Sequence, residues 1–419
     1  MEQISLLDLV ACVCNVIDLV SDVIKDHHNK VAYGAYYLTE AMGIKGEQKR
    51  DIIIAAALHD VGGLSLNDRL TAITLEFEDS NCHAEKGYRL LRDFEPFQNI
   101  SDIVRNHHTP WNNGKAIDAL ENPIPLGSQI VLMADRIAVM LRPDINVLNQ
   151  RKSVINTITR QKNSIYRPDL IAAFKKISNK DAFWLDIMSK NFNDSIKGKL
   201  KEDDISLSGA NLTEALNLLS RIIDYRSFFT ASHSKGVSVV ARELSKLMDF
   251  SEEECFLMEV AGLLHDIGKL AVPSEIIEKQ GPLNTNEKNI MHCHTYYTEK
   301  VLSHFNGFET IIQWASFHHE NLDGSGYPFG IGEADLNLGA RIMKVADVFT
   351  ALMENRPYRP SMGLENSLNT LHTMVNKHEL DRSVVDVLCE NADHIDHVFQ
   401  EESRQADLNY KKFLEGLEE

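Results

Sequence analysis

The sequence predicts an all-α protein made of two domains, and three observations support this fold class. Apolar residues recur at intervals of three and four, the period of an amphipathic helix, as in Val237, Val240, Ala241, Leu244 and Leu247. Runs that alternate apolar and polar residues, which are typical of strands, are scarce. The 419 residues are too many for one ordinary core. They suit two domains of about 200 residues each.

A polar, charged stretch near the middle of the chain is the best candidate for the domain boundary. It runs from residue 193 to residue 209 and contains no apolar run. We therefore expect one domain over residues 1–200 and a second over residues 201–419.

The charge balance narrows the classes of partner. The chain has 43 Lys and Arg against 61 Asp and Glu, which gives a net charge of −18 at pH 7. This disfavours nonspecific binding to duplex nucleic acid or to an anionic membrane, because both depend on clustered basic residues. A small anionic substrate stays compatible, because bound metal ions can invert the local field of an acidic protein.

The cysteines and the N-terminal segment bear on the compartment. None of the six cysteines forms a Cys-x-x-Cys pair, so we expect a reducing cytoplasm rather than a disulfide framework. Residues 4–24 are apolar but are interrupted by Asp8, Asn15, Asp18 and Asp22. We expect an amphipathic helix that packs on its own domain there, not a signal peptide or a transmembrane helix.

An internal repeat of histidines and aspartates is the most informative feature. The first half carries His28, His59, Asp60, His83, His107, His108 and Asp135, and the second half carries His233, His265, Asp266, His294, His318, His319 and Asp347. The types occur in one order in both halves, and the first two histidines are 31 residues apart in the first half and 32 in the second. Repeats of this kind indicate two copies of one structural unit.

This set of side chains predicts a metal site within a helical bundle, formed where ligands from separate helices meet. Five histidines and two aspartates exceed the needs of one tetrahedral zinc ion, and they suit two octahedral ions that share a bridging carboxylate. We assign the bridge to Asp266. Imidazole with carboxylate suits iron or manganese, and also nickel or cobalt. Any single histidine could be an ordinary core or surface residue, but the repeated order favours ligands.

The second half contains two longer motifs around these residues. One is His265-Asp266-Ile267-Gly268-Lys269, and the other, at residues 318–328, matches HHExxDGxGYP at every specified position. With these HD and GYP signatures, residues 221–385 resemble the HD-GYP family of bacterial cyclic-dinucleotide phosphodiesterases. The resemblance implies that two metal ions bind a phosphodiester and activate water. It further implies hydrolysis of cyclic di-GMP or 3′,3′-cyclic GMP-AMP to a linear dinucleotide.

The resemblance also suggests which residues act on the substrate. We expect Asp266 and Lys269 to be catalytic, because Lys269 lies one helical turn past His265 and can place its ammonium on a phosphate oxygen. The expected substrate-binding residues are Lys269, Asp323, Gly326, Tyr327, Pro328, Arg341, Arg356 and Arg359. Alternative interpretations are a solvated lysine, an ordinary surface turn at 323–328 and a solvated helix end at 356–359.

One position departs from some members of the family. Those members have a glutamate four residues before the first histidine, where it supports a third metal ion, and this chain has Phe229 there. We therefore expect two ions rather than three, and one cut rather than two.

The first half resembles the wider HD superfamily and is a diverged copy of the second. Its ligand types are retained, but Gly63 stands where the second half has Lys269, and no Gly-Tyr-Pro follows His107 and His108. Two interpretations stay open: a metal-binding domain that regulates the other or senses a ligand, and a scaffold that provides a packing or homodimer surface. A second catalytic activity is a less favoured third.

Several alternatives for the whole chain also stay open. It could be a cyclic-dinucleotide sensor with weak or no turnover, an HD phosphohydrolase that acts on another nucleotide, or an interaction scaffold. The choice between guanine and adenine depends on hydrogen bonds to base edges, which one sequence does not reveal.

Overall fold

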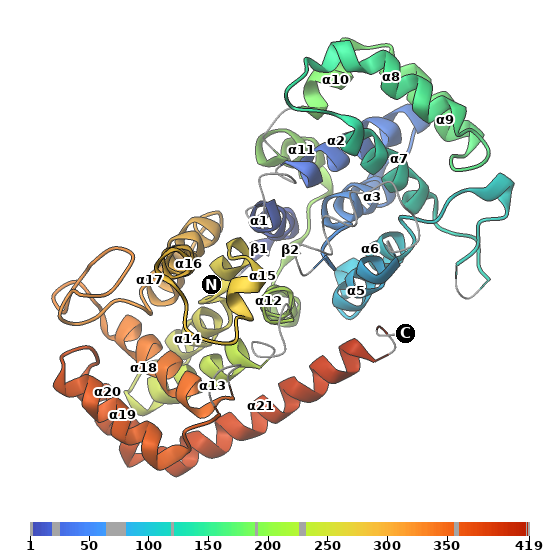
Figure 1. Ribbon diagram of the computed structural model, residues 1–419. Helices are drawn as coiled ribbons and strands as arrows, with labels where there is room; N and C mark the ends of the chain where they lie inside the picture. The colour runs from blue at the N-terminus through green and yellow to red at the C-terminus, as the bar shows by residue number, and fades with distance from the viewer. Residues whose placement is uncertain are drawn as a thin grey trace. The chain divides into compact units, whose positions relative to one another are not determined.

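The computed structural model describes residues 3–18, 26–63, 81–118, 121–188, 192–225, 232–355, 360–415 and 417. The described chain is overwhelmingly helical (Figure 1), which confirms the all-α prediction. It divides into two compact units, Ile4–Asn211 and Leu212–Glu419 with Met1–Gln3. None of the described helices is both long enough and apolar enough to span a membrane.

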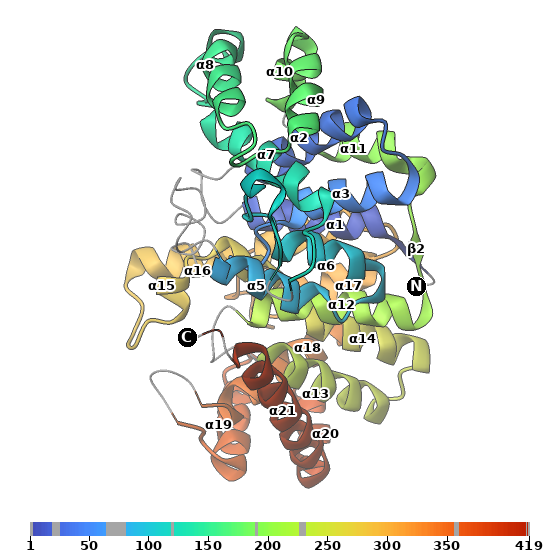
Figure 2. The ribbon, with the colours of Figure 1, turned by 90° about the vertical axis from the view of Figure 1, so that its right-hand side faces the viewer.

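The N-terminal unit contains two short strands and a series of helices. In chain order they are β1 Ile4–Ser5, α1 Leu6–Asp18, α2 His27–Met42, α3 Gly46–Leu58, α5 Asn81–Leu91, η1 Glu95–Phe97, α6 Gln98–Arg105, η2 Asn112–Gly114, α7 Leu126–Met140, α8 Val147–Arg160, α9 Pro168–Ser178, α10 Asp181–Ile187, α11 Phe192–Leu200, η3 Lys201–Asp203 and β2 Ser206–Leu207. At its centre α2 packs against α3 and α7, whereas α8, α9 and α10 form a cluster at one end of the unit (Figure 2).

The two strands keep residues 204–207 with the N-terminal unit. Ile4 pairs with Leu207 and Ser5 with Ser206 in an antiparallel register, and Asp204 accepts a hydrogen bond from the Ser5 hydroxyl at 2.7 Å. The sequence placed the boundary between residues 200 and 201, whereas the compact units divide after Asn211.

The C-terminal unit consists of helices. They are α12 Gly209–Asp224, which begins just before the division, α13 His233–Leu247, α14 Glu252–Leu264, η4 Ile267–Ala271, α15 Ser274–Ile277, α16 Thr285–Leu302, α17 Glu309–Ser316, α18 Leu338–Met353, α19 Leu364–Asn376, α20 Arg382–Glu390 and α21 Ala392–Leu414. Helix α13 packs against α14, α18 and the long α21 (Figure 1). Its apolar series is buried except at its end, where Leu247 is 38% exposed.

Local sequence signals start two of these helices. Ser251 with Glu254 and Asn284 with Glu287 each form a capping box, in which two otherwise unpaired backbone N–H groups gain partners. Close packing is set by Gly262, where a Cβ atom would lie 2.4 Å from Ser238 Cα, so that α13 and α14 nearly touch. The close approach brings the ends of these helices, which carry the repeated histidines, to one place.

Candidate metal centre

The repeated residues of the second half converge from five segments of the C-terminal unit. His233 begins α13, His265 and Asp266 follow α14, His294 lies in α16, His318 and His319 follow α17, and Asp347 lies in α18. All are buried except His319, which is partly exposed. The packing of the bundle therefore collects side chains that are up to 114 residues apart, from His233 to Asp347.

The side chains form two groups of potential ligands on either side of Asp266. One group is His233, His265 and Asp347, and the other is His294, His318 and His319; within each, the ligand atoms lie within 4.8 Å of one another. Asp266 Oδ2 lies 3.2 Å from His265 Nε2 and 3.6 Å from His233 Nε2. Its Oδ1 lies 3.5 Å from His294 Nε2. One carboxylate thus presents one oxygen to each group, as a bridging ligand does.

Backbone carbonyls orient the histidine rings. The Nδ1 atoms of His265, His294 and His318 lie 2.8, 2.6 and 2.6 Å from the carbonyl oxygens of Gly262, Met291 and Ala315 respectively. A carbonyl oxygen only accepts, so each Nδ1 carries the proton and each Nε2 offers its lone pair to the centre. Hydrogen bonds of this kind fix the tautomer of metal-binding histidines.

The ionisation states suit metal binding. Burial lowers the pKa of His294 to about 4 and that of His318 to about 3, against the raising effect of nearby carboxylates. The pKa of Asp266 is well below its usual range, because His265 and Lys269 outweigh the opposing effect of burial. His294 and His318 are therefore neutral at pH 7 and Asp266 is ionised, and these are the forms that coordinate cations.

Two buried atoms support a cation in this position. His265 Nε2 and Asp266 Oδ1 have no hydrogen-bond partner among the described residues. Buried polar atoms without partners carry a substantial energetic cost, which coordination would remove. The residues present therefore fit a divalent metal pair, held by the two groups with Asp266 between them.

Lys269 lies at the edge of this centre. Its ammonium is 2.5 Å from Asp266 Oδ2, and its side chain is 17% exposed. Gly268, immediately before it, fits closely against α16, because a Cβ atom there would lie 1.8 Å from His294 O. The lysine is thus held beside the ligands with its side chain partly exposed.

Glu320 holds the loop that follows the paired histidines. Its carboxylate is fully buried and accepts hydrogen bonds from the backbone N–H groups of Phe329 at 2.7 Å, Gly330 at 3.3 Å and Ile331 at 3.2 Å. Gly326 is required for close packing, because a Cβ atom there would lie 2.4 Å from Glu320 Cα. The buried carboxylate therefore fixes the loop over residues 324–332.

The loop directs Tyr327 toward the ligands. The ring of Tyr327 stacks on His292 with centroids 3.8 Å apart and lies 4.8 Å from the ring of His319. Pro328 follows it and is exposed, and Asp323 is exposed and accepts a hydrogen bond from the Ser325 N–H at 2.9 Å. Tyr327 therefore lies beside the centre, whereas Asp323 acts within its own turn.

Arg341 is engaged elsewhere. Its guanidinium donates to Asp381 Oδ2 at 2.8 Å and to the carbonyl oxygens of Leu336 at 2.8 Å and Glu333 at 2.6 Å. These bonds tie the segment before α18 to α20, and they engage the guanidinium with protein partners. Arg356, Arg359 and Phe229 lie outside the described residues.

Two carboxylates near His233 were not predicted from the sequence. Glu354 Oε2 lies 3.0 Å from His233 Nδ1 and orients that ring. Asp224 accepts a hydrogen bond from the Ser234 hydroxyl at 2.7 Å, and burial raises its pKa to about 7. Glu354 lies two helical turns after Asp347, and this spacing was the available signal; Asp224 has no comparable signal.

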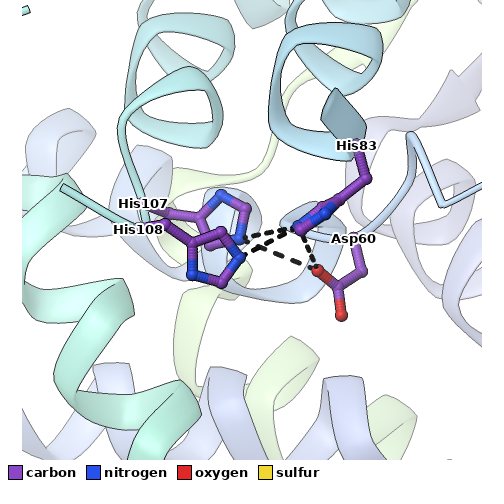
Figure 3. A group of neighbouring side chains, drawn as sticks. All are labelled: Asp60, His83, His107 and His108. Carbon is purple, nitrogen blue, oxygen red and sulfur yellow. Dashed lines mark hydrogen bonds and ion pairs between the residues drawn. The ribbon is translucent and has the colours of Figure 1, made fainter. Parts of the chain in front are cut away.

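The N-terminal unit has the same arrangement of side chains, with Asp60 in the position that Asp266 holds in the C-terminal unit. Asp60 Oδ2 lies 3.2 Å from His59 Nε2, and Oδ1 lies 3.2 Å from His83 Nε2. Figure 3 shows His83, His107 and His108 gathered on the Oδ1 side. Asp135 lies with the other group, together with His59.

The histidine that occupies the position of His233 is His27. Its Nε2 lies 3.3 Å from Asp135 Oδ1, as His233 Nε2 lies 3.3 Å from Asp347 Oδ1. His28, which the sequence analysis chose, also lies near His59 and Asp60. His27 precedes His59 by 32 residues, the same separation as in the second half, and this equality was the signal that could have found it.

Comparison with known families agrees with this geometry. Residues 24–140 match a family model described as "HD domain", and residues 217–384 match a second model with the same description. The chain contains two HD domains. Each match spans the metal-ligand candidates of its own unit, from His27 to Asp135 and from His233 to Asp347.

The chain is similar to two proteins of Vibrio cholerae and to one of Xanthomonas campestris. The chain is 29% identical to 3′3′-cGAMP-specific phosphodiesterase 1 over 391 residues, which covers 91% of the chain and 90% of that protein. It is 27% identical to 3′3′-cGAMP-specific phosphodiesterase 3, over 70% of the chain and 64% of that protein. It is also 39% identical to the cyclic di-GMP phosphodiesterase response regulator RpfG of *Xanthomonas campestris*, over 38% of the chain and 43% of that protein.

A solved structure shares the fold. The crystal structure of a cyclic GMP-AMP-specific phosphodiesterase of *V. cholerae*, V-cGAP3, superposes with a TM-score of 0.63. The match covers 94% of the chain and 98% of that structure at 19% sequence identity. The helical fold is therefore common to both proteins over nearly their whole length.

Proposed function

We propose that the C-terminal unit is a metal-dependent phosphodiesterase that hydrolyses a cyclic dinucleotide, cyclic GMP-AMP or cyclic di-GMP, to a linear dinucleotide. The observation that carries the proposal is Asp266, which directs one carboxylate oxygen to each of two ligand groups. The relatives named above, whose printed activities are of this class, support the substrate type.

Two divalent ions, iron or manganese in the first place and nickel or cobalt as alternatives, would be held by His233, His265, His294, His318, His319 and Asp347 around Asp266. When bound, such ions polarise a phosphodiester and make water a stronger nucleophile at neutral pH. The histidines contribute neutral Nε2 donors, and Asp266 and Asp347 contribute the negative charge that balances the cations.

Residues beside the centre would bind the substrate. Lys269 places a partly exposed, cationic side chain beside Asp266, so its ammonium would contact a non-bridging phosphate oxygen. Tyr327, stacked on His292 and held by its loop, would position a sugar or base over the centre. We assign Gly326 and Pro328 to shaping this loop and Asp323 to stabilising its turn.

The decisive experiment uses the purified full-length chain, stripped of metal and reloaded with Mn(II) or Fe(II). Each cyclic dinucleotide is supplied separately, and the products are separated by chromatography. We expect linear dinucleotide only with metal present, and none from Asp266→Ala, whereas the exposed Asp393→Ala serves as a matched control with normal turnover. Equal rates in wild type and Asp266→Ala would contradict the bridging role.

The same experiment separates the alternatives. Tight binding without cleavage would identify a sensor, and cleavage of other nucleotides in preference would identify a different phosphohydrolase. Binding of neither metal nor nucleotide would identify a scaffold. None of the six cysteines forms a disulfide, which fits the cytoplasm that we propose as the compartment. A homodimer stays a prediction.

A further inference from the structure

The cluster of the N-terminal unit repeats the ligands of the C-terminal unit but not their surroundings. Where the C-terminal unit has Ser234 after its first histidine, the N-terminal unit has His28. Where the C-terminal unit has Val348 after its last aspartate, the N-terminal unit has Arg136. His28 adds a potential metal ligand to the first group, and Arg136 brings a positive charge to the second group.

The first group of the N-terminal unit contains several potential metal ligands. His27, His59 and Asp135 have ligand atoms within 4.8 Å of one another, and so do His28, His59 and Asp60. The Oδ2 atom of Asp135 is buried without a hydrogen-bond partner among the described residues. The two sets share His59, and together they contain five potential ligands for a cation.

The second group contains His83, His107 and His108 beside Asp60 Oδ1. Their Nε2 atoms crowd together, with His83 3.4 Å from His107 and 3.0 Å from His108 (Figure 3). His107 resembles the ligands of the C-terminal unit, because its Nδ1 donates to Val104 O at 2.6 Å and leaves the lone pair on Nε2.

His108 differs, because its outer nitrogen faces Arg136. Arg136 is 4% exposed, and its Nη2 lies 3.5 Å from His108 Nδ1. A guanidinium has only donors, so His108 Nδ1 must accept. A neutral imidazole that accepts at Nδ1 carries its proton on Nε2, which is the atom directed at His83. That proton can be donated to His83 Nε2, but it removes the lone pair that a metal would need.

Arg136 also changes the charge of the site. Its Nε lies 3.7 Å from Asp135 Oδ2, so a permanent positive charge already offsets one of the two carboxylates. The C-terminal unit also has a cation beside one carboxylate, Lys269 on Asp266, but Glu354 adds a third carboxylate behind His233. At the position that corresponds to Glu354, the N-terminal unit has Arg142, which pairs with Asp144 at the surface. The N-terminal cluster is therefore less able to neutralise two divalent cations.

We propose that the N-terminal unit binds one divalent cation, at His27, His28, His59, Asp60 and Asp135, and that Arg136 prevents a second from binding at His83, His107 and His108. The inference rests on the proposed function only in taking the C-terminal unit as the two-ion reference. It makes the N-terminal unit a mononuclear centre within a duplicated dinuclear fold.

The first test counts metal ions in the full-length chain. Wild type, Arg136→Met and Arg136→Lys are stripped with a chelator, reloaded with Mn(II), desalted and measured by mass spectrometry of the metal. We expect Arg136→Met to gain one ion per chain and Arg136→Lys, which retains the charge, to gain none. Because the C-terminal unit is the same in all three, its contribution cancels. A folded Arg136→Met with no gain would overturn the proposal.

The second test keeps Arg136 and so does not depend on the folding of its variants. In an Asp266→Ala chain, the C-terminal unit lacks its bridge, and paramagnetic resonance of bound Mn(II) reports spin coupling in the N-terminal unit alone. We expect one uncoupled ion, which is lost on adding Asp60→Ala. A spin-coupled pair would overturn the proposal. Failure of the proposed function would instead appear as missing turnover in wild type, with these results unchanged.

Discussion

At the scale of single residues, the ligands depend on atoms that face away from the metal centre. His265, His294 and His318 use backbone carbonyls of their own helices to fix the tautomer. His233 uses the carboxylate of Glu354 instead. A charged partner raises the basicity of the ring more than a carbonyl does, and a change at such partners alters metal affinity.

Replacing Glu354 tests this role. We expect Glu354→Gln to weaken metal binding about 10- to 100-fold, because the amide no longer supplies negative charge to the Nδ1–H of His233. Titration of the metal-free protein with Mn(II) measures the effect, and activity should return at high metal concentration. The exposed Glu365→Gln is the matched control; an equal affinity in both variants would contradict the assignment.

The buried imidazoles predict how the stability of the metal-free protein depends on pH. The folded pKa of His294, about 4, lies below its unfolded value of 6.5, so the unfolded chain takes up the proton first. The free energy of unfolding that His294 contributes is therefore lost as pH falls from 6.5 to about 4, by on the order of 3 kcal/mol. Asp224 acts in the opposite sense, because burial raises its pKa to about 7.

A comparison of variants separates these two effects. Urea unfolding of metal-free wild type and His294→Gln is measured from pH 7.5 to 4.5. We expect wild type to lose stability relative to His294→Gln on acidification, while the contribution of Asp224 is common to both. A difference that does not change with pH would contradict the burial of a neutral imidazole.

At the scale of elements, contact between η4 and α16 places two ligands of different groups. Gly268 in η4 donates its N–H to the Thr298 hydroxyl at 3.1 Å, and that hydroxyl donates to His265 O at 2.9 Å. The N-terminal unit has the same contact, since a Cβ atom at Gly62 would lie 2.1 Å from His83 O. In both units, a glycine after the His-Asp pair allows the next helix to approach.

Because of this contact, we expect that adding a single methyl group at Gly268 affects both stability and metal binding. We expect Gly268→Ala to lower the free energy of unfolding by about 1–3 kcal/mol and to reduce metal binding, because the backbone at His294 must move away from Asp266. Thermal unfolding and metal counting measure both effects. Gly198→Ala is the control, because that helical position is open and should gain about 0.5–1 kcal/mol.

The loop over residues 324–332 offers a separate test, because the Glu320 carboxylate holds it through three backbone N–H groups of the loop. We expect Glu320→Ala to raise KM for the cyclic dinucleotide while metal content stays unchanged, since Tyr327 loses its fixed position. Steady-state kinetics with metal analysis distinguishes this result from loss of the centre. A variant that loses metal in proportion to activity would place Glu320 in the metal site instead.

At the scale of the whole molecule, duplication has produced two centres with different surroundings. Both units keep an aspartate between two groups of histidines. Only the C-terminal unit has Lys269 beside the bridge, and the N-terminal unit has Gly63 there. We therefore assign catalysis to the C-terminal unit alone.

Matched substitutions at the two bridges test this division. We expect Asp266→Ala to abolish hydrolysis and Asp60→Ala to retain most of it, because the latter removes ligands only from the N-terminal unit. Rates on cyclic GMP-AMP, measured with metal counts for each variant, decide the question. Loss of turnover in Asp60→Ala with full metal in the C-terminal unit would show instead that the N-terminal unit regulates catalysis.

The sequence by itself determined the fold class, the duplication and nearly all the ligand candidates. Helical periodicity, the His-Asp pairs and their spacing are properties of local sequence, and they do not depend on how the helices pack. The choice between His27 and His28 also lay within reach, through the separation of 32 residues shared with the second half.

Only the tertiary structure decided which atoms meet. It turned each oxygen of Asp266 to a different group, placed Glu354 behind His233, and engaged Arg341 with Asp381. It also directed Arg136 at the outer nitrogen of His108. These contacts form because helices that are distant in the sequence pack against one another. Burial then excludes water, so that each polar atom has only a few possible partners in the protein.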